Sequence, residues 1–236
     1  FIEYPARLVA HDKIYDLALY RMSGNPPKDA LKFSEHEARM GESVFAVGYP
    51  LSSLWQKVSF GKVGNTDIWP RTAEIRHMEL DMAACPGNSG GPLLNESGEV
   101  VGIVSSVIFE GGEDRCTHFT FAISSRYAKK VIDDFIRFGR ARHALIGITM
   151  KYSKYDNKWL PAIETVKADG PAKRAGLQAG DIILSISGRQ IWTTMDVKRI
   201  ILEQTIAGEN ITLRIVRDGE ERAITVIVAE KLNNEP

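Results

Sequence analysis

The segment with the most distinctive chemistry is residues 81–94, which read DMAACPGNSGGPLL. It holds a serine framed by glycines, Gly87-x-Ser89-x-Gly91, and glycine lets a backbone turn tightly. Such a loop can point the backbone N–H groups of Gly87, Asn88 and Ser89 into one concavity. There they would stabilise an oxyanion forming beside the Ser89 hydroxyl, by about 3 kcal/mol for each donor. The segment therefore indicates a nucleophilic serine, although an ordinary glycine-rich hairpin loop has the same pattern.

The Gly-x-Ser-x-Gly pattern also occurs at the nucleophile elbow of α/β-hydrolases, where a helix follows the serine. Here an Asn-Glu-Ser-Gly turn at residues 95–98 follows instead, and then a strand-like run at residues 99–104. The serine therefore precedes a β-hairpin, which excludes the elbow.

The composition excludes several other classes of protein. The 236 residues include 30 Lys and Arg against 30 Asp and Glu, so the net charge is zero and no nucleic-acid partner is predicted. A hydrophobic share of 44% is typical of a globular protein, and no apolar run is long enough to predict a membrane span. The two cysteines cannot form a four-thiolate zinc site, and no nucleotide loop or cofactor motif is found. We therefore predict neither a metal nor a cofactor.

Short strand-like runs fill the chain up to residue 124. They are rich in β-branched and aromatic residues and bounded by Gly, Pro, Asn or Asp; examples are residues 6–9, 17–20, 43–47 and 100–104. Regular short strands predict a mostly β fold, either an antiparallel barrel or a sandwich.

Residues 125–140 follow a helical period, with apolar and charged residues on opposite faces. Ser124 or Ser125 is the predicted N-cap, and Gly139 is the predicted stop. We interpret this segment as a connecting helix.

The remaining residues alternate strands with helices. They include an amphipathic helix at 194–204 and a terminal hairpin around Asp218-Gly219, a strong hairpin turn signal. The chain therefore divides into a β domain, a connecting helix and an α+β domain, with predicted bounds 1–124, 125–142 and 143–232.

The serine segment closely resembles the nucleophile loop of chymotrypsin-fold serine proteases, and in particular that of the HtrA (Deg) family. Further matching stretches are YPARLVAHD and DLAL at residues 4–12 and 16–19, GYP at 48–50, VSFGKV at 58–63, and FAIS at 121–124. In the last stretch Ser124 stands where the family has proline. The resemblance implies a chymotrypsin-like antiparallel β-barrel, with its N-terminal barrel truncated in this chain.

The resemblance also implies the roles of individual residues. Ser89 is the nucleophile, Asp16 is the carboxylate that orients the catalytic histidine, and Gly87 and Ser89 donate to the oxyanion. Asp12 lies nearby in the sequence, but the DLAL match begins with Asp16.

The same resemblance implies a primary specificity pocket with Ala83 at its base and Cys85 and Ser105 beside it. Without a carboxylate to pair a Lys or Arg, this pocket favours small to medium apolar side chains. Cys85 and Cys116 would lie on opposite walls, which chymotrypsin-fold enzymes often bridge by a disulfide, although HtrA-like sequences generally lack it. Two buried, reduced cysteines are the alternative; a disulfide would indicate an oxidising compartment such as the periplasm.

The histidine of a Ser–His–Asp triad is not evident in the chain. In the family it precedes the aspartate by a few tens of residues, which would place it before Phe1. We interpret the five histidines as surface or structural residues: His11, His36, His77, His118 and His143. We therefore expect the catalytic histidine and most of the first barrel to lie upstream, and expect this chain alone to be inactive.

Residues 170–188, GPAKRAGLQAGDIILSISG, strongly resemble the core of a PDZ domain. The run Leu145-Ile146-Gly147-Ile148 resembles its carboxylate-binding loop, in which Gly147 lets successive N–H groups face a peptide C-terminus. A bound peptide would add as a strand beside residues 148–150. The helix at 194–204 would supply an apolar pocket from Val197, Ile200 and Ile201, of which one is expected to belong to the core instead.

These resemblances imply an ATP-independent serine endopeptidase of protein quality control, which cleaves unfolded or mislocalised proteins and binds peptide C-termini. They also imply an exported, periplasmic protein, with a membrane anchor conceivable upstream of Phe1, and trimers formed through N-terminal segments. Peptide binding is expected to raise proteolysis through the loops at 49–60, 64–76 and 106–118. The alternative is a catalytically inert, protease-like scaffold in which only the PDZ domain functions.

Overall fold

We describe the protein from a computed structural model, which covers residues 4–24, 29–52, 55–70, 73, 75–105 and 117–231. The chain forms two compact units, Phe1–Ala141 and Arg142–Pro236. Within the described residues, no helix is both long and apolar enough to cross a membrane.

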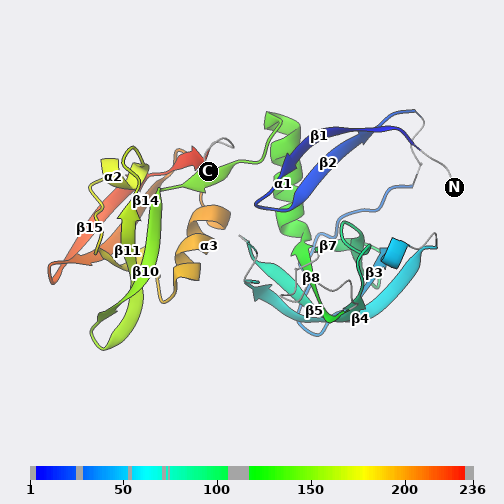
Figure 1. Ribbon diagram of the computed structural model, residues 1–236, viewed down its shortest axis with the longest axis horizontal. Coiled ribbons are helices and arrows are strands. Elements are labelled where there is room, and N and C mark those ends of the chain that lie inside the picture. The colour runs from blue at the N-terminus through cyan, green and yellow to red at the C-terminus, as the bar shows by residue number, and fades with distance from the viewer. Residues whose placement is uncertain are drawn as a thin grey trace. The chain divides into compact units, whose positions relative to one another are not determined.

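Six antiparallel strands of the first unit close into a barrel, in the spatial order β3-β4-β5-β8-β7-β6 (Figure 1). The strands are β3 (Ser43–Gly48), β4 (Lys57–Ile68), β5 (His77–Ala84), β6 (Pro92–Asn95), β7 (Val100–Ser105) and β8 (Thr117–Ser124). Every second side chain of β3 is buried, as expected for a strand with one face on a core. That core includes Val44, Leu80 and Leu93. The predicted antiparallel barrel is therefore confirmed.

A separate two-stranded hairpin packs beside a helix in the same unit (Figure 1). These elements are β1 (Ala6–Asp12), β2 (Leu17–Met22) and α1 (Ser125–Phe138). One face of α1 buries Val131 and Phe135 in a core that also contains Ala10 of β1. The helix ends at the predicted stop, Gly139, whose φ of 71° lies in the left-handed region and whose N–H donates to the Phe135 carbonyl oxygen. The predicted connecting helix thus packs as part of the first unit.

The second unit is built on a sheet in the order β10-β11-β12-β14-β15, with β13 paired to β12 and a separate β9–β16 pair. Its elements are β9 (His143–Leu145), β10 (Ile148–Tyr155), β11 (Lys158–Val166), α2 (Pro171–Arg174), β12 (Ile182–Ile186), β13 (Arg189–Gln190), α3 (Thr194–Gln204), β14 (Asn210–Arg217), β15 (Glu220–Ile227) and β16 (Ala229–Lys231). Asp218 and Gly219 join β14 to β15 with φ values of 54° and 82°, the two left-handed residues of a type I′ turn. The predicted α+β fold and its terminal hairpin are confirmed.

Candidate active site and peptide-binding edge

The nucleophile loop is held against the β3–β4 loop by two backbone hydrogen bonds. The Leu51 N–H donates to the Pro86 carbonyl oxygen at 2.7 Å. The Tyr49 N–H donates to the Gly87 carbonyl oxygen at 3.2 Å. Because a trans peptide points its N–H opposite to its C=O, the Gly87 N–H faces away from Leu51. The Gly87 N–H therefore points out of the contact between the two loops and is available as an oxyanion donor.

Only glycine fits at the centre of this arrangement. A Cβ on Gly87 would overlap the Tyr49 carbonyl oxygen, so the close approach of the two loops depends on its absence. The φ of Gly87, 100°, is also one that residues with a side chain rarely adopt. The glycine at this position is thus a requirement of the loop geometry.

One of the three predicted oxyanion donors is excluded. The Asn88 N–H donates to the Cys85 carbonyl oxygen at 3.1 Å, so it is used inside the turn. Among backbone hydrogen bonds between described residues, none uses the N–H of Gly87 or Ser89. The prediction of Asn88 as a donor is therefore wrong, and Gly87 and Ser89 are the remaining candidates. Asn88 instead packs its buried side chain against Gly48.

Two adjacent residues of β7 connect the nucleophile loop to Asp16. Val104 accepts the Gly90 N–H at 2.8 Å and donates its own N–H to the Gly91 carbonyl oxygen at 2.9 Å. Ser105, the next residue, donates its hydroxyl to Asp16 Oδ2 at 3.2 Å. The loop that carries the exposed Ser89 and the Asp16 carboxylate are therefore brought to the same end of β7.

The β1–β2 turn distinguishes the two candidate aspartates. Asp12 is buried and accepts the Tyr15 N–H at Oδ1, 2.8 Å away, so it shapes the turn. Asp16 has a φ of 52° and reaches Ser105 instead. The family resemblance implies that Ser105 lies beside the specificity pocket, and the structure shows that its hydroxyl bonds to Asp16. No local signal predicts that bond, because 89 residues separate the two side chains.

His77 is buried rather than part of a polar surface. It is 5% exposed, and its Nδ1 lies 3.1 Å from the Ile75 carbonyl oxygen. Burial lowers the pKa of His77 below its ordinary value, and the Ile75 carbonyl and the negative charge of Asp16 only partly offset this. His77 is therefore neutral near pH 7. His143 is also buried, whereas the other three histidines are exposed.

The neutral state of His77 makes the stability of the first unit dependent on pH. The pKa of His77 is below 6.5 in the folded chain and near 6.5 when unfolded, so the unfolded chain binds more protons once the pH falls below 6.5. We expect the free energy of unfolding to decrease from pH 7 towards pH 5, measured by urea denaturation. His77→Phe is expected to reduce this decrease, whereas His11→Gln, at an exposed position, should leave it unchanged. Identical pH profiles for His77→Phe and wild type would contradict the assignment.

The predicted specificity pocket is described only in part. Ala83 lies exposed near the end of β5, and Cys85 follows it as a disulfide-bonded, half-buried residue. Cys116 and the loop at 106–116 lie outside the described residues.

The second unit presents an open sheet edge beside a glycine turn. β10 is the terminal strand of its sheet and pairs with β11 alone among the described strands. Just before it, Gly147 has a φ of 78°, and its carbonyl oxygen accepts the Lys167 N–H at 2.9 Å. The carbonyl oxygen of Ile146 accepts the Ala172 N–H at 2.8 Å. The loop backbone is thus fixed on its carbonyl side, next to an edge that a peptide strand can extend.

The three pocket candidates on α3 belong to the hydrophobic core. Val197, Ile200 and Ile201 are 0%, 4% and 7% exposed. Val197 has no exposed surface, so it is the one of the three that belongs to the core alone. Ile200 and Ile201 retain a small exposed fraction, and their role in a pocket stays a prediction. Ile148 and Met150 of β10, which are half-buried against the same core, are better placed to contact a peptide.

Two family models match the chain, one to each unit. A model described as "Trypsin-like peptidase domain" matches residues 2–103, and one described as "PDZ domain" matches residues 144–228.

Curated relatives match along nearly the whole chain. "Serine protease Do-like HtrA" of Bacillus subtilis (strain 168) is 30% identical, covering 97% of this chain and 56% of the relative. "Probable periplasmic serine endoprotease DegP-like" of Marinomonas sp. (strain MWYL1) is 32% identical, and the match covers 98% of this chain and 50% of the relative. The chain therefore spans about half the length of the curated relatives it matches.

Solved structures match the same architecture. "HtrA-type protease AlgW with decapeptide" has a TM-score of 0.82 at 24% identity, over 96% of this chain and 72% of that one. "Crystal structure of the serine endoprotease from Yersinia pestis" has a TM-score of 0.73 at 29% identity, and the match covers 97% of this chain and 76% of that chain.

Proposed function

Because the chain belongs to the HtrA family of trypsin-like serine proteases with a C-terminal PDZ domain, we propose that the protein is an ATP-independent serine endopeptidase of protein quality control. The observation that carries this proposal is the pair Val104 and Ser105, which hold the nucleophile loop and Asp16 at one end of β7. We assign residues 1–124 to the protease domain, 125–142 to the connecting helix and 143–232 to the PDZ domain. The proposed substrates are unfolded or mislocalised proteins, and the proposed assembly is a trimer.

In the proposed mechanism Ser89 attacks the carbonyl carbon of the scissile peptide bond. A histidine from outside these 236 residues takes the Ser89 proton and later gives it to the leaving amine. Asp16 orients that histidine, and the N–H groups of Gly87 and Ser89 stabilise the tetrahedral oxyanion. Ala83, at the base of the primary pocket, favours small to medium apolar side chains before the cleaved bond.

The full-length protein allows a direct test of this function. We expect it to hydrolyse unfolded casein without ATP, and expect a fluorophosphonate probe, which reacts with activated serines, to stop hydrolysis. Mass spectrometry of the labelled peptide should place the probe on Ser89. Hydrolysis that survives the probe, or a probe attached to another serine, would contradict the proposal.

We also propose that the second unit binds peptides with a free C-terminal carboxylate and an apolar last residue. The peptide would pair with the open edge of β10, with its carboxylate at the Gly147 turn. Calorimetry should show binding at least about tenfold weaker for the C-terminal amide of the same peptide, because a charge-assisted hydrogen bond is lost. Equal affinity for acid and amide would rule out carboxylate capture.

Peptide binding is proposed to raise hydrolysis through the β3–β4 loop. Leu51 of this loop holds the Pro86 carbonyl oxygen, which lies in the same peptide plane as the Gly87 N–H, so a shift of the loop would alter that donor. The loops at 64–76 and 106–118 are the other candidates for this coupling.

We also propose a disulfide between Cys85 and Cys116. Cys85 is disulfide-bonded, and disulfides persist in oxidising compartments. The relative from Marinomonas is named as a periplasmic endoprotease. On these two grounds we propose that the protein is exported. Such a bond would close a loop of about thirty residues and stabilise the fold by roughly 3–4 kcal/mol. Non-reducing peptide mapping should recover the two cysteine peptides joined. Labelling of two free thiols in the native, unreduced protein would contradict the bond.

A further inference from the structure

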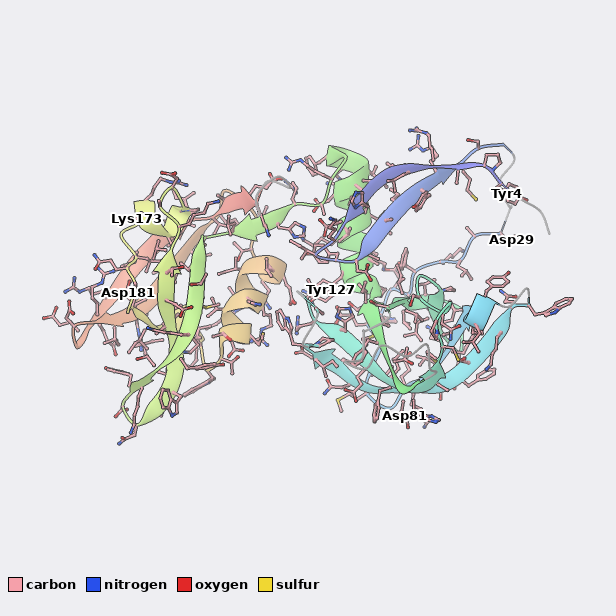
Figure 2. All side chains as sticks on the ribbon, viewed as in Figure 1. Tyr4, Asp29, Asp81, Tyr127, Lys173 and Asp181 are labelled. Atoms are coloured by element: carbon pink, nitrogen blue, oxygen red, sulfur yellow. The ribbon has the colours of Figure 1, made fainter. Side chains whose placement is uncertain are left out.

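The residue before Asp16 is a buried tyrosine that packs on a second one. Tyr15 is 1% exposed and Tyr127 is 7% exposed, and their ring centroids lie 6.4 Å apart with an interplanar angle of 35°. Tyr127 lies in the first turn of α1, where the helix follows strand β8 (Figure 2). The tyrosine pair therefore connects α1 to the turn that carries Asp16.

A cation holds each of these tyrosines. Lys130 Nζ donates to the Tyr15 hydroxyl at 3.2 Å and lies 5.4 Å from the ring centroid. Arg76 Nη2 donates to the Tyr127 hydroxyl at 2.8 Å, and its guanidinium lies 6.0 Å from that ring centroid. Arg76 is itself paired with Asp67 at 2.6 Å. A continuous set of contacts thus runs from β4 through α1 to the β1–β2 turn.

The β1–β2 turn needs such support. Asp16 has a φ of 52°, in the left-handed region, which Asp tolerates but adopts less readily than Gly. The hairpin also has only two strands, and an isolated two-stranded hairpin is marginally stable. The fixed Tyr15 ring and the bond from the Tyr15 N–H to Asp12 restrict the backbone next to Asp16. The bond from Ser105 to Asp16 forms only with the turn in that place.

We propose that Tyr15 and Tyr127 are positioning residues for the Asp16 carboxylate, and that Arg76 fixes the Tyr127 ring. This inference rests on the proposed protease function. If Asp16 moves, it no longer orients the catalytic histidine, so kcat falls while substrate binding, which uses other residues, is preserved. Misplacement of a reacting group by about 1 Å costs on the order of a hundredfold in rate.

Tyr127→Leu in the full-length protein is the first test. We expect kcat for a peptide substrate to fall roughly 30- to 100-fold, with KM changed less than about twofold. Tyr127→Phe keeps the ring but loses the bond from Arg76, and should lower kcat roughly three- to tenfold. Rates are expressed per Ser89 titrated with a fluorophosphonate, so that unfolded protein is not counted.

Phe135→Leu is the matched control. Phe135 is buried in the same core cluster, but among the described residues the ring that packs on Tyr15 is that of Tyr127 and not that of Phe135. Its substitution is expected to lower stability and leave kcat unchanged. A fall in kcat equal to that of Tyr127→Leu would indicate general loosening of the core and overturn the proposal.

A double-mutant cycle with Asp16→Asn separates positioning from general structure. If Tyr127 acts through the Asp16 carboxylate, Tyr127→Leu should have almost no further effect on kcat in the Asp16→Asn background. An equal loss of kcat in both backgrounds, or an unchanged kcat for Tyr127→Leu alone, would overturn the inference. If Tyr127→Leu fails to fold, Tyr127→Phe and Arg76→Gln take its place in the cycle. Absence of Ser89-dependent hydrolysis in the wild type would instead overturn the proposed function, and this inference with it.

Discussion

Replacing Ser89 by alanine in the full-length protein is expected to abolish casein hydrolysis, with kcat lowered by roughly five to six orders of magnitude. The effect is this large because the hydroxyl supplies the atom that attacks the peptide bond, and no neighbouring group can replace it. The Ser89 side chain is exposed, so its truncation removes no core packing. Circular dichroism and the thermal midpoint should therefore match the wild type.

Ser97→Ala is the matched control for this experiment. Ser97 is also exposed and lies in the turn after β6. Its backbone N–H donates to the Asn95 side chain, and this bond does not depend on the Ser97 hydroxyl. We expect full activity from this variant. Hydrolysis by Ser89→Ala at near the wild-type rate would assign the activity to another group or to a contaminant.

Replacing Asp181 by alanine is expected to destabilise the second unit by about 3–5 kcal/mol. Asp181 is 1% exposed, and both its oxygens accept from Arg217, each at 2.7 Å (Figure 2 labels Asp181). Its Oδ2 also accepts the Gln178 N–H at 2.8 Å. Removal of the carboxylate leaves the Gln178 N–H without that acceptor, and leaves the largely buried Arg217 guanidinium with the Gly176 carbonyl oxygen but no counter-charge. This is more costly than loss of an exposed ion pair.

Hydrogen–deuterium exchange can assign this loss to the correct unit. Amides of β12 and β14 should exchange faster in Asp181→Ala, while amides of the barrel strands keep their wild-type rates. Glu221→Ala is the control, because Glu221 pairs with Arg214 on the same sheet at 3.3 Å but both side chains are about half exposed. We expect that variant to lose less than about 1 kcal/mol. An equally small effect for Asp181→Ala would mean that the buried pair contributes little.

The amino-acid sequence alone determined those features that depend on local backbone geometry. The glycines around Ser89 identify a tight loop because the φ of Gly87 and its approach to Tyr49 exclude any side chain. Asp218-Gly219 identifies the last hairpin for the same kind of reason. The helical period and the Gly139 stop locate α1, since both arise from residues within one or two turns.

Only the tertiary structure decided what depends on contacts between distant segments. The hydrogen bond from Ser105 to Asp16 joins residues from β7 and the β1–β2 turn, so residue type and spacing along the chain could not predict it. The burial of His77, and of Val197, Ile200 and Ile201 on α3, depends on which elements pack against them. An apolar helix face has the same sequence pattern whether it lines a pocket or a core. The exclusion of Asn88 as a donor follows from the direction of one peptide plane, which the glycine pattern permits but does not specify.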